Sequence, residues 1–266
     1  MKAKRTGFLS GWCLWMAGIS LMISLTVAPS MGAEGLDDKA DTILKSMSAY
    51  LGGLKTFSMN ADVDLEIVGL NGQKLQISSF ATTMVQRPDK FYITRKGMIS
   101  NAEFIFDGST LTVHGKTLNA YYQTTGGKSI DEAIRAYESE TGIPAPGADI
   151  LFSDPYSVLS SEVDGGDYIG TAYVNGVKCH HLAFRKAKVD WQLWVATGDR
   201  PLPMKYVITT KWITGAPQYE IRLRDWDLNP RIKKNQFSFT APAGGVKLEA
   251  ISIGDMGEIT SSGEGK

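Results

Sequence analysis

The chain has 266 residues, of which 43% are hydrophobic, 10% are aromatic and 28 are glycine. This composition excludes collagenous, low-complexity and intrinsically disordered classes and is typical of a globular protein with a sizeable core. Beyond residue 33 the chain carries 25 bases and 28 acids, a net charge of −3. A basic nucleic-acid-binding surface is therefore not expected.

The first 33 residues have the pattern of a secretory signal. Three basic residues within the first five precede an uncharged, mostly apolar stretch from residue 7 to residue 28. Pro29 and the small residues after it offer a cleavage site, and we expect cleavage after Ala33. An uncleaved membrane anchor stays open as the alternative, because about 20 uncharged residues can span a bilayer.

Removal of the signal leaves Cys179 as the single cysteine. An intramolecular disulfide is then impossible, so stability in an oxidising compartment has to come from burial alone. A lone cysteine on a strand is usually a small buried hydrophobe, and we adopt this interpretation over that of a reactive thiol.

The first element after the signal is an amphipathic helix over residues 37–54. Its apolar residues recur at three- and four-residue spacing, with an aspartate at its start and two glycines at its end. From residue 56 to residue 67 the period changes to two, which predicts a long, half-buried antiparallel strand. Asn71-Gly72 then predicts a hairpin.

The rest of the chain is predicted to form short strands that are interrupted by a helical insertion. In the insertion, Ser129 and Glu132 form a capping box, and Gly142 ends the helix that they begin. Shorter helices are predicted over residues 149–152 and 155–159. The remaining strands are predicted over residues 74–86, 91–95, 102–106, 110–114, 118–124, 167–174, 177–184, 189–195, 204–212, 219–227 and 236–240.

These elements favour a single mainly β domain over residues 34–247. We predict a half-open antiparallel barrel of about 10 or 11 strands whose open side is covered by a helical lid. A polar, Gly- and Ser-rich tail over residues 248–266 is expected to be disordered. Side chains alone do not fill the interior of so large a curved sheet, so either the helices plug it completely or an apolar cavity remains.

The sequence lacks the usual catalytic and cofactor signatures. No G-x-S-x-G, Walker, G-x-G-x-x-G, H-E-x-x-H or paired C-x-x-C motif occurs in it. His180 and His181 are adjacent on a predicted strand and point to opposite faces, so they do not readily bind one metal together. We interpret these two histidines and His114 as side chains that are hydrogen-bonded within the protein or exposed to solvent, and not as metal ligands. We expect no enzymatic activity, no metal and no cofactor.

Asp62, Asp64 and Glu66 lie on one side of the first strand, about 7 Å apart at two-residue intervals. Calcium sites gather oxygens from loops, and this run has no loop, so we interpret the three acids as part of a solvated outer face. Arg222 and Arg224 share one face of a late strand and can pair with these acids if the two strands are neighbours.

Aromatic and methyl-rich side chains occur in nearly every predicted element. Most of them belong to the core, but on a concave sheet that faces helices they also describe a pocket for acyl chains. Affinity for such a chain would grow by about 0.8 kcal/mol for each buried CH₂ group. The residues that we predict to line this pocket are Phe57, Met59, Val63, Leu65, Phe104, Phe106, Ile134 and Tyr137.

Four short segments carry a family resemblance that spans residues 37–247. They are Arg87-Pro88-Asp89-Lys90-Phe91, Asp107-Gly108-Ser109-Thr110-Leu111, Leu193-Trp194-Val195 running into Thr197-Gly198 and Leu202-Pro203, and Asn235-Gln236-Phe237-Ser238-Phe239-Thr240-Ala241-Pro242. In this order, and with the preceding helix, they resemble the LolA/LolB-like superfamily of periplasmic lipoprotein carriers. More closely, the chain resembles the predicted periplasmic proteins of the DUF2092 group.

The resemblance implies a half-open antiparallel barrel with a helical lid over an apolar cavity that takes up lipid acyl chains. It also implies that Arg87, in the position of the carriers' arginine, latches the lid when the cavity is empty. A physical argument agrees, because an arginine near helix carbonyls can hold a lid by hydrogen bonds that an incoming ligand would break. The alternative is a turn residue whose stem covers apolar surface.

We therefore expect a non-catalytic, monomeric periplasmic protein that binds a lipid or the acyl chain of a lipoprotein and hands it to a second envelope protein. Residues 142–146 and 153–156 match the uncharacterised group better than the carriers, so lipoprotein transport itself does not follow. Two alternatives stay open. One is an envelope sensor, regulator or scaffold that acts through its surface, and the other is an enzyme whose polar groups converge only in the folded chain.

Overall fold

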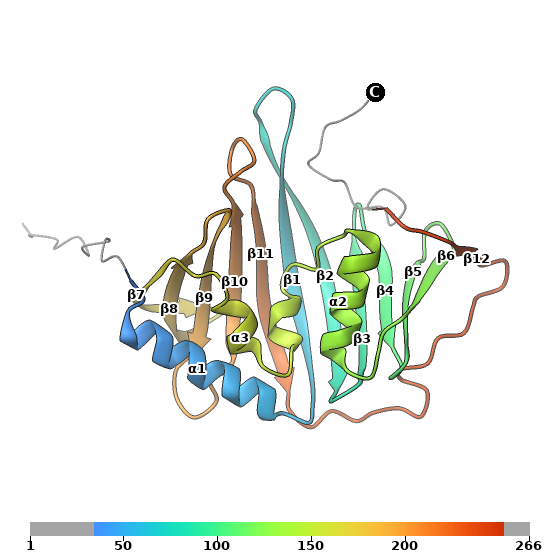
Figure 1. Ribbon diagram of the computed structural model, residues 1–266, viewed down its shortest axis with the longest axis horizontal. Helices are drawn as coiled ribbons and strands as arrows, with labels where there is room; N and C mark the ends of the chain where they lie inside the picture. Colours follow the sequence, from blue (N-terminus) through green and yellow to red (C-terminus); the bar gives the residue numbers. More distant parts are fainter. Residues whose placement is uncertain (1–34, 253–266) are drawn as a thin grey trace, which may run out of the picture. The chain divides into compact units, whose positions relative to one another are not determined.

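The chain forms one open sheet of 12 strands in the part that the computed structural model describes, residues 35–252 (Figure 1). In chain order the strands are β1 (Thr56–Val68), β2 (Lys74–Gln86), β3 (Lys90–Gly97), β4 (Asn101–Phe106), β5 (Thr110–Gly115), β6 (Ala120–Thr125), β7 (Gly165–Val174), β8 (Val177–Arg185), β9 (Val189–Ala196), β10 (Pro203–Thr210), β11 (Gln218–Asp227) and β12 (Val246–Leu248). Their order across the sheet is β12-β6-β5-β4-β3-β2-β1-β11-β10-β9-β8-β7. The sheet is not closed into a barrel, because β12 and β7 are its two edges. This confirms the predicted half-open, mainly β architecture.

All of the described residues belong to one compact unit. The expected signal and most of the expected tail lie outside the described residues. Ile251, at the start of the expected tail, is buried against the core. Within residues 35–252, none of the helices has both the length and the apolar character needed to cross a membrane.

The two halves of the sheet meet at β1. Its pairing with β2 runs from Thr56↔Gln86 to Val68↔Lys74 through the predicted Asn71-Gly72 turn. On its other side β1 pairs antiparallel with β11, for example Leu65↔Tyr219. A strand from the beginning of the domain thus lies beside one that is more than 150 residues further along the chain.

The alternation of β1 separates an apolar face from a charged face. Met59 and Val63 are buried beneath the helices, whereas the acids point to the other side of the sheet. There, Arg224 Nε lies 2.9 Å from Asp62 Oδ2, and Arg222 Nη1 lies 3.5 Å from Asp64 Oδ2. The predicted pairing of these arginines with the acids of β1 is confirmed.

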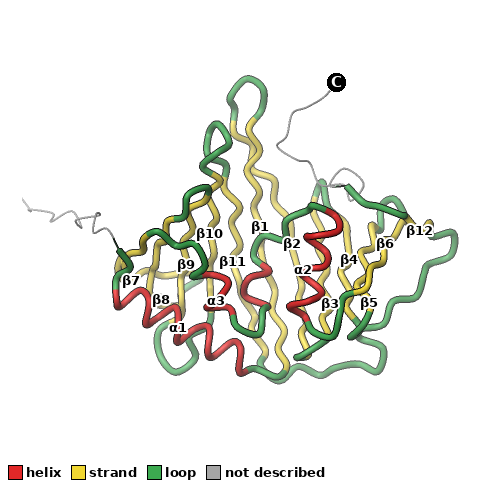
Figure 2. Tube along the Cα trace, in the orientation of Figure 1, coloured by secondary structure: helices red, strands yellow, loops and turns green. Residues whose placement is uncertain are grey.

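The helices lie on the apolar face of the sheet (Figure 2). They are α1 (Asp38–Gly53), α2 (Ile130–Thr141), the 3₁₀ helix η1 (Ala148–Leu151) and α3 (Pro155–Leu159). In α1 the Asp37 carboxylate caps the first turn, and the buried stripe packs towards β7, β8 and α3. In α2 the Ser129 hydroxyl accepts a hydrogen bond from the Glu132 amide at 3.2 Å, and Gly142 ends the helix in the left-handed region. These two helices begin where the sequence predicts.

The predicted strand over residues 236–240 is wrong. This segment forms turns and coil, and the edge beside β6 is taken by β12, which pairs in parallel. Phe239 packs through its side chain: its ring lies 5.5 Å from that of His114 and 5.1 Å from that of Tyr121. The strand expected to reach Trp212 ends at Thr210, and Trp212 is 70% exposed in the following loop.

Candidate ligand-binding cavity

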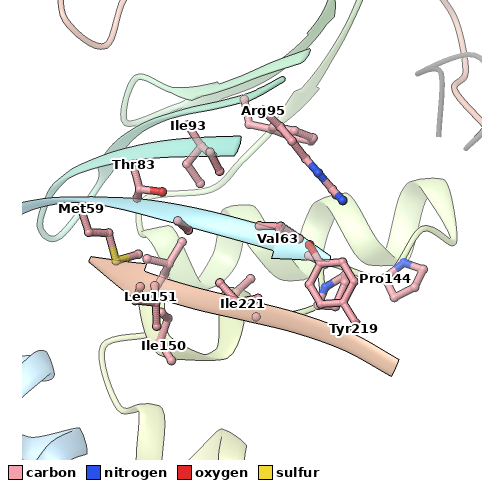
Figure 3. Close-up of a pocket in the computed structure, with 18 of the residues that line it drawn as sticks. Met59, Val63, Thr83, Ile93, Arg95, Pro144, Ile150, Leu151, Tyr219 and Ile221 are labelled. Carbon is pink, nitrogen blue, oxygen red and sulfur yellow. The ribbon is translucent and has the colours of Figure 1, made fainter. Parts of the chain in front are cut away.

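A cavity of about 180 Å³ lies between the middle of the sheet and the segment that joins α2 to η1. Along β1 it extends from Met59 to Val63, roughly 13 Å at the ordinary rise of a strand. Figure 3 shows side chains from both layers that point into it. The sheet contributes Met59, Ala61, Val63, Ala81, Thr83, Ile93, Arg95, Phe104, Tyr219, Ile221 and Leu223, and the helical layer contributes Tyr137, Ile143, Pro144, Ala145, Pro146, Gly147, Ala148, Ile150 and Leu151.

The cavity is apolar at its buried end and less so at its exposed end. Met59, Ala61 and Leu151 are almost completely buried, whereas Pro144 is exposed and Arg95 is half-buried. Among the described lining residues Arg95 is the only one with a charge, and Thr83 contributes the only aliphatic hydroxyl. The described lining therefore provides mostly apolar contact area, with Arg95 at its less buried end.

The lining follows from strand alternation and register. Ala61 on β1 lies opposite Ala81 on β2 and Leu223 on β11, so three adjacent strands present small or branched apolar groups to the same face. Ala81 lies in turn opposite Arg95 on β3. Two alanines in the middle of this row leave the space that becomes the cavity.

The roof of the cavity depends on Gly147. Its φ of 84° lies in the left-handed region, and a Cβ at this position would collide with Ile221 Cδ1. Only glycine combines that backbone with so close an approach. The segment between α2 and η1 can thus turn directly onto the sheet above β11.

Two polar contacts hold η1 over the sheet. Arg87 Nη1, from the turn between β2 and β3, donates to the Leu151 carbonyl oxygen at 2.7 Å. The Tyr206 hydroxyl on β10 donates to Asp149 Oδ2 at 3.2 Å. Burial lowers the pKa of Arg87 and raises the pKa of Asp149, because each charge has lost part of its hydration.

The structure brings four of the nine residues predicted for the site into the cavity wall: Met59, Val63, Phe104 and Tyr137. The Phe104 and Tyr137 rings meet edge to face at 6.2 Å and link β4 to α2. The other five lie elsewhere. Phe57, Phe106 and Ile134 are buried in the core, Leu65 is half-buried further along β1, and Arg87 lies outside the cavity, with its guanidinium against Leu151 and 5.8 Å from the Phe57 ring.

Sequence reasoning missed the lining from β11 and from the segment after α2. Tyr219, Ile221 and Leu223 alternate as clearly as Met59 and Val63 do. Their place beside β1 is a long-range pairing that the local pattern does not contain. The segment 143–147 lacks periodicity altogether, and its two prolines are its only local signal.

The histidines lie away from the cavity. His180 Nδ1 is 3.2 Å from the Tyr168 hydroxyl, whereas His181 Nε2 is 2.9 Å from Gln192 Oε1 and its ring stacks on Trp194 at 4.1 Å. The described residues contain no group of three or more His, Cys, Asp or Glu that could hold a metal ion. Cys179 is buried, as expected of a lone cysteine on a strand.

The described residues thus form an open sheet that holds a largely apolar cavity beneath its helices. Residues 40–251 match the family described as "Predicted periplasmic protein (DUF2092)". The chain belongs to this family. This match confirms the resemblance to the DUF2092 group and the periplasmic location expected from the sequence.

The solved structures that match the chain share little sequence identity with it. An uncharacterized conserved protein from Thermus thermophilus has a TM-score of 0.49 and 10% identity, over 79% of this chain and 98% of that one. LprF from Mycobacterium bovis has a TM-score of 0.44 and 14% identity, over 77% and 100%. The LolA superfamily protein NE2245 from Nitrosomonas europaea has a TM-score of 0.38 and 8% identity, over 75% and 97%. Comparison with curated proteins finds no match.

Proposed function

We propose that the chain is a non-catalytic periplasmic binding protein that holds an acyl chain of a lipid or lipoprotein between the sheet and η1. The observation that carries this proposal is the lining of the cavity, in which every described residue except Arg95 is uncharged. Each CH₂ group that leaves water for such a site contributes about 0.8 kcal/mol. No covalent chemistry is required of the protein.

The size of the cavity indicates that its roof has to move. A volume of about 180 Å³ is close to that of an engineered apolar cavity of about 150 Å³ that binds benzene. A long acyl chain needs more room than this. The segment from residue 143 to residue 151 is the part of the roof that can give way, since it includes η1 and a linker without regular structure.

Arg87 is the proposed latch of this roof. Its hydrogen bond to the Leu151 carbonyl oxygen favours the closed position, and an acyl chain that displaces η1 would break it. The two positions would differ in their contacts with the ligand, which is the condition for a ligand to shift the equilibrium between them. Transfer of the bound chain to a second envelope protein would restore the closed position.

The proposal is tested by native mass spectrometry of protein purified from the periplasm without detergent. We expect a mass increment that matches bound lipid and is lost on denaturation. A second sample carries Ala61→Phe, which places a ring in the middle of the cavity, and is expected to purify without lipid.

The matched control is Asn60→Phe, the neighbouring position on β1, whose side chain points to the opposite face of the sheet. Its lipid content is expected to equal that of the natural sequence, and circular dichroism checks that both variants fold. Natural protein that is consistently empty and binds no added 12-carbon amphiphile would contradict the proposal and favour a protein that acts through its surface.

A further inference from the structure

The turns at one end of the strands carry exposed apolar side chains. These turns, which we call the hairpin rim, cover residues 69–73, 98–100, 116–119, 186–188 and 211–217. They lie at the same end because the strands of each meander are antiparallel and β1 lies antiparallel to β11. Four large apolar side chains of the rim are between 57% and 105% exposed: Leu70, Met98, Leu118 and Trp212. Exposed apolar groups that gather in one region indicate a surface that another body covers.

Two turns of the hairpin rim project beyond the others (Figure 1). They are the β1–β2 turn, which carries Leu70, and the β10–β11 turn, which carries Trp212. The two turns are neighbours, because a Cβ at Gly215 would lie 3.1 Å from Val68 Cγ2 at the end of β1. A leucine and a tryptophan thus occupy adjacent tips at this end of the sheet.

The hairpin rim is also basic. Its five turns contain no aspartate or glutamate, and they contain four lysines: Lys116, Lys186, Lys188 and Lys211. The opposite rim comprises the turns 87–89, 107–109, 175–176 and 197–202. It contains two arginines and three aspartates. Some lysines of the hairpin rim pair with acids inside the strands, as Lys211 Nζ does with Asp190 Oδ1 at 2.8 Å. The turns themselves are positive, which favours an anionic partner.

The less buried end of the cavity lies towards the hairpin rim. Arg95, in the cavity wall, is two residues before the end of β3, and Tyr219 is the second residue of β11. Met59, at the closed end, is near the start of β1 and therefore towards the opposite rim. A surface that covers the hairpin rim would thus lie beside the open end of the cavity.

A lipid bilayer fits these features better than a protein partner does. Tryptophan is enriched where lipid meets water, and lysines beside an apolar tip interact with anionic head groups. A stable protein interface needs about 800 Å² on each side, whereas the apolar side chains of the rim stand on separate turns. A bilayer accommodates separate tips because its lipids can move around each of them.

We propose that the hairpin rim docks on an anionic lipid bilayer, with Leu70 and Trp212 inserted at the boundary between head groups and acyl chains. The lysines of the rim contact the head groups, and the less buried end of the cavity then faces the membrane. Docking does not require an occupied cavity. The inference therefore goes beyond acyl binding and holds or fails independently of it.

The test is sedimentation of the protein, purified from the periplasm without detergent, with vesicles of two compositions. One contains phosphatidylglycerol and phosphatidylcholine in equal parts, and the other contains phosphatidylcholine alone. We expect the protein to bind the anionic vesicles about tenfold or more tightly, since each lysine near an anionic surface contributes about fivefold. Added salt is expected to weaken this binding.

Insertion of Trp212 is tested with anionic vesicles whose acyl chains carry bromine, which quenches tryptophan fluorescence on contact. We expect part of the fluorescence to be quenched on binding. Trp212→Phe keeps an apolar ring and is expected to bind while losing that quenched part. Trp212→Ala is expected to bind anionic vesicles about tenfold or more weakly. Its matched control is Tyr173→Ala, which removes an aromatic side chain that is 71% exposed beside the opposite rim and is expected to bind like the natural protein.

The basic contribution is tested by the double variant Lys186→Gln with Lys188→Gln. We expect about 25-fold weaker binding to anionic vesicles, which is the product of two single losses. The control removes two charges near the opposite rim, Lys178→Gln with Arg200→Gln, both at exposed positions, and is expected to keep the natural affinity. Thermal melts check that every variant folds.

Three results would overturn the docking proposal. They are equal affinity for both kinds of vesicle, absence of binding to either, and binding of Trp212→Ala that equals that of the natural protein. If sedimentation velocity shows a dimer that Trp212→Ala converts to a monomer, the rim is an interface between two copies instead. Native mass spectrometry decides acyl binding separately. Empty protein that docks on vesicles refutes the acyl proposal alone, and lipid-filled protein that ignores vesicles refutes docking alone.

Discussion

Arg87 and Asp149 act on the same short helix from different elements. Arg87 reaches the last residue of η1 from the β2–β3 turn, and Asp149, inside η1, accepts from Tyr206 on β10. A helix of four residues has little stability of its own, so such contacts determine how firmly it covers the cavity. Each of them leads to a prediction at the level of a single side chain.

Arg87→Met keeps an apolar stem and removes the donor to the Leu151 carbonyl oxygen. A hydrogen bond from a charged donor contributes about 1.5–3 kcal/mol, and its loss destabilises the closed position. We expect the apparent affinity for dodecanoate to rise by about 10- to 100-fold in calorimetry. Arg200→Gln, at an exposed position, is the control for the change in charge. An affinity that stays the same or falls would indicate that Arg87 is only a turn residue.

Asp149→Asn addresses the partly buried carboxyl within η1. Burial raises the pKa of Asp149, so the folded state binds a proton more tightly than the unfolded state, and stability falls as the pH rises through the interval between the two pKa values. We expect the variant to exceed the natural protein in its free energy of urea unfolding at pH 7 and this difference to shrink as the pH approaches 4. Asp199→Asn, in an exposed loop, should show no such trend. If the difference in unfolding free energy between the variant and the natural protein stays constant across the pH range, the raised pKa does not belong to Asp149.

At the scale of elements, α2 carries Tyr137 at the cavity wall. The N-terminus of this helix is capped by hydrogen bonds between residues that are close together in the sequence. The Ser129 hydroxyl accepts from the Glu132 amide, and Glu132 Oε2 accepts from the Lys128 amide at 2.7 Å. Two backbone donors that the helix itself cannot satisfy are thereby paired.

Ser129→Ala removes the first of these two bonds. We expect a loss of about 1 kcal/mol in unfolding free energy and a melting temperature lower by about 2–4 °C for a domain of this size. Ser129→Asp retains an acceptor and adds a favourable charge at the helix N-terminus, so it should melt near the natural protein. Equal losses in both variants would show that the hydroxyl stabilises α2 by packing rather than by capping.

Elements with a local cause could be predicted from the sequence. The alternation of residues 56–67 and the Ser129 cap identify β1 and α2 because their signals lie within a few residues of each other. The segment 236–240 has the same alternation without being a strand. Its Phe239 side chain packs against Tyr121, and a short alternating pattern does not distinguish such packing from pairing at the edge of a sheet.

Only those parts of the cavity wall that follow from alternation within a single strand could be predicted from the sequence. Met59 and Val63 follow from the pattern of β1, and Phe104 follows from that of β4. Tyr219 and Ile221 enter the wall through the pairing of β1 with β11, and Arg95 through the neighbouring pairing of β2 with β3. Which side chains share a cavity is thus decided by register across strands, which a single sequence does not state.

At the scale of the whole sheet, two meanders lie side by side, one before α2 and one after α3. β1, the first strand of the first meander, joins them by pairing with β11, the last strand of the second. The first, β1 to β6, carries Phe57 and Met59 on its apolar face, and the second, β7 to β11, carries Trp191 and Leu193. Each half has its own hairpins. Neither half covers the cavity alone, because Ile221 and Leu223 on β11 complete the wall that β1 begins.

The late pairing of β1 with β11 shapes how the newly exported chain reaches its native state. Residue 65 cannot pair until residue 219 has left the membrane. Closing so long a loop before its contacts form slows folding relative to a chain with mostly local contacts. During that delay the unpaired edge of β1 and its apolar face stay accessible to other chains, as in other β topologies that fold slowly. The same strand that joins the two halves of the mature sheet is therefore the part of the chain whose pairing is completed last.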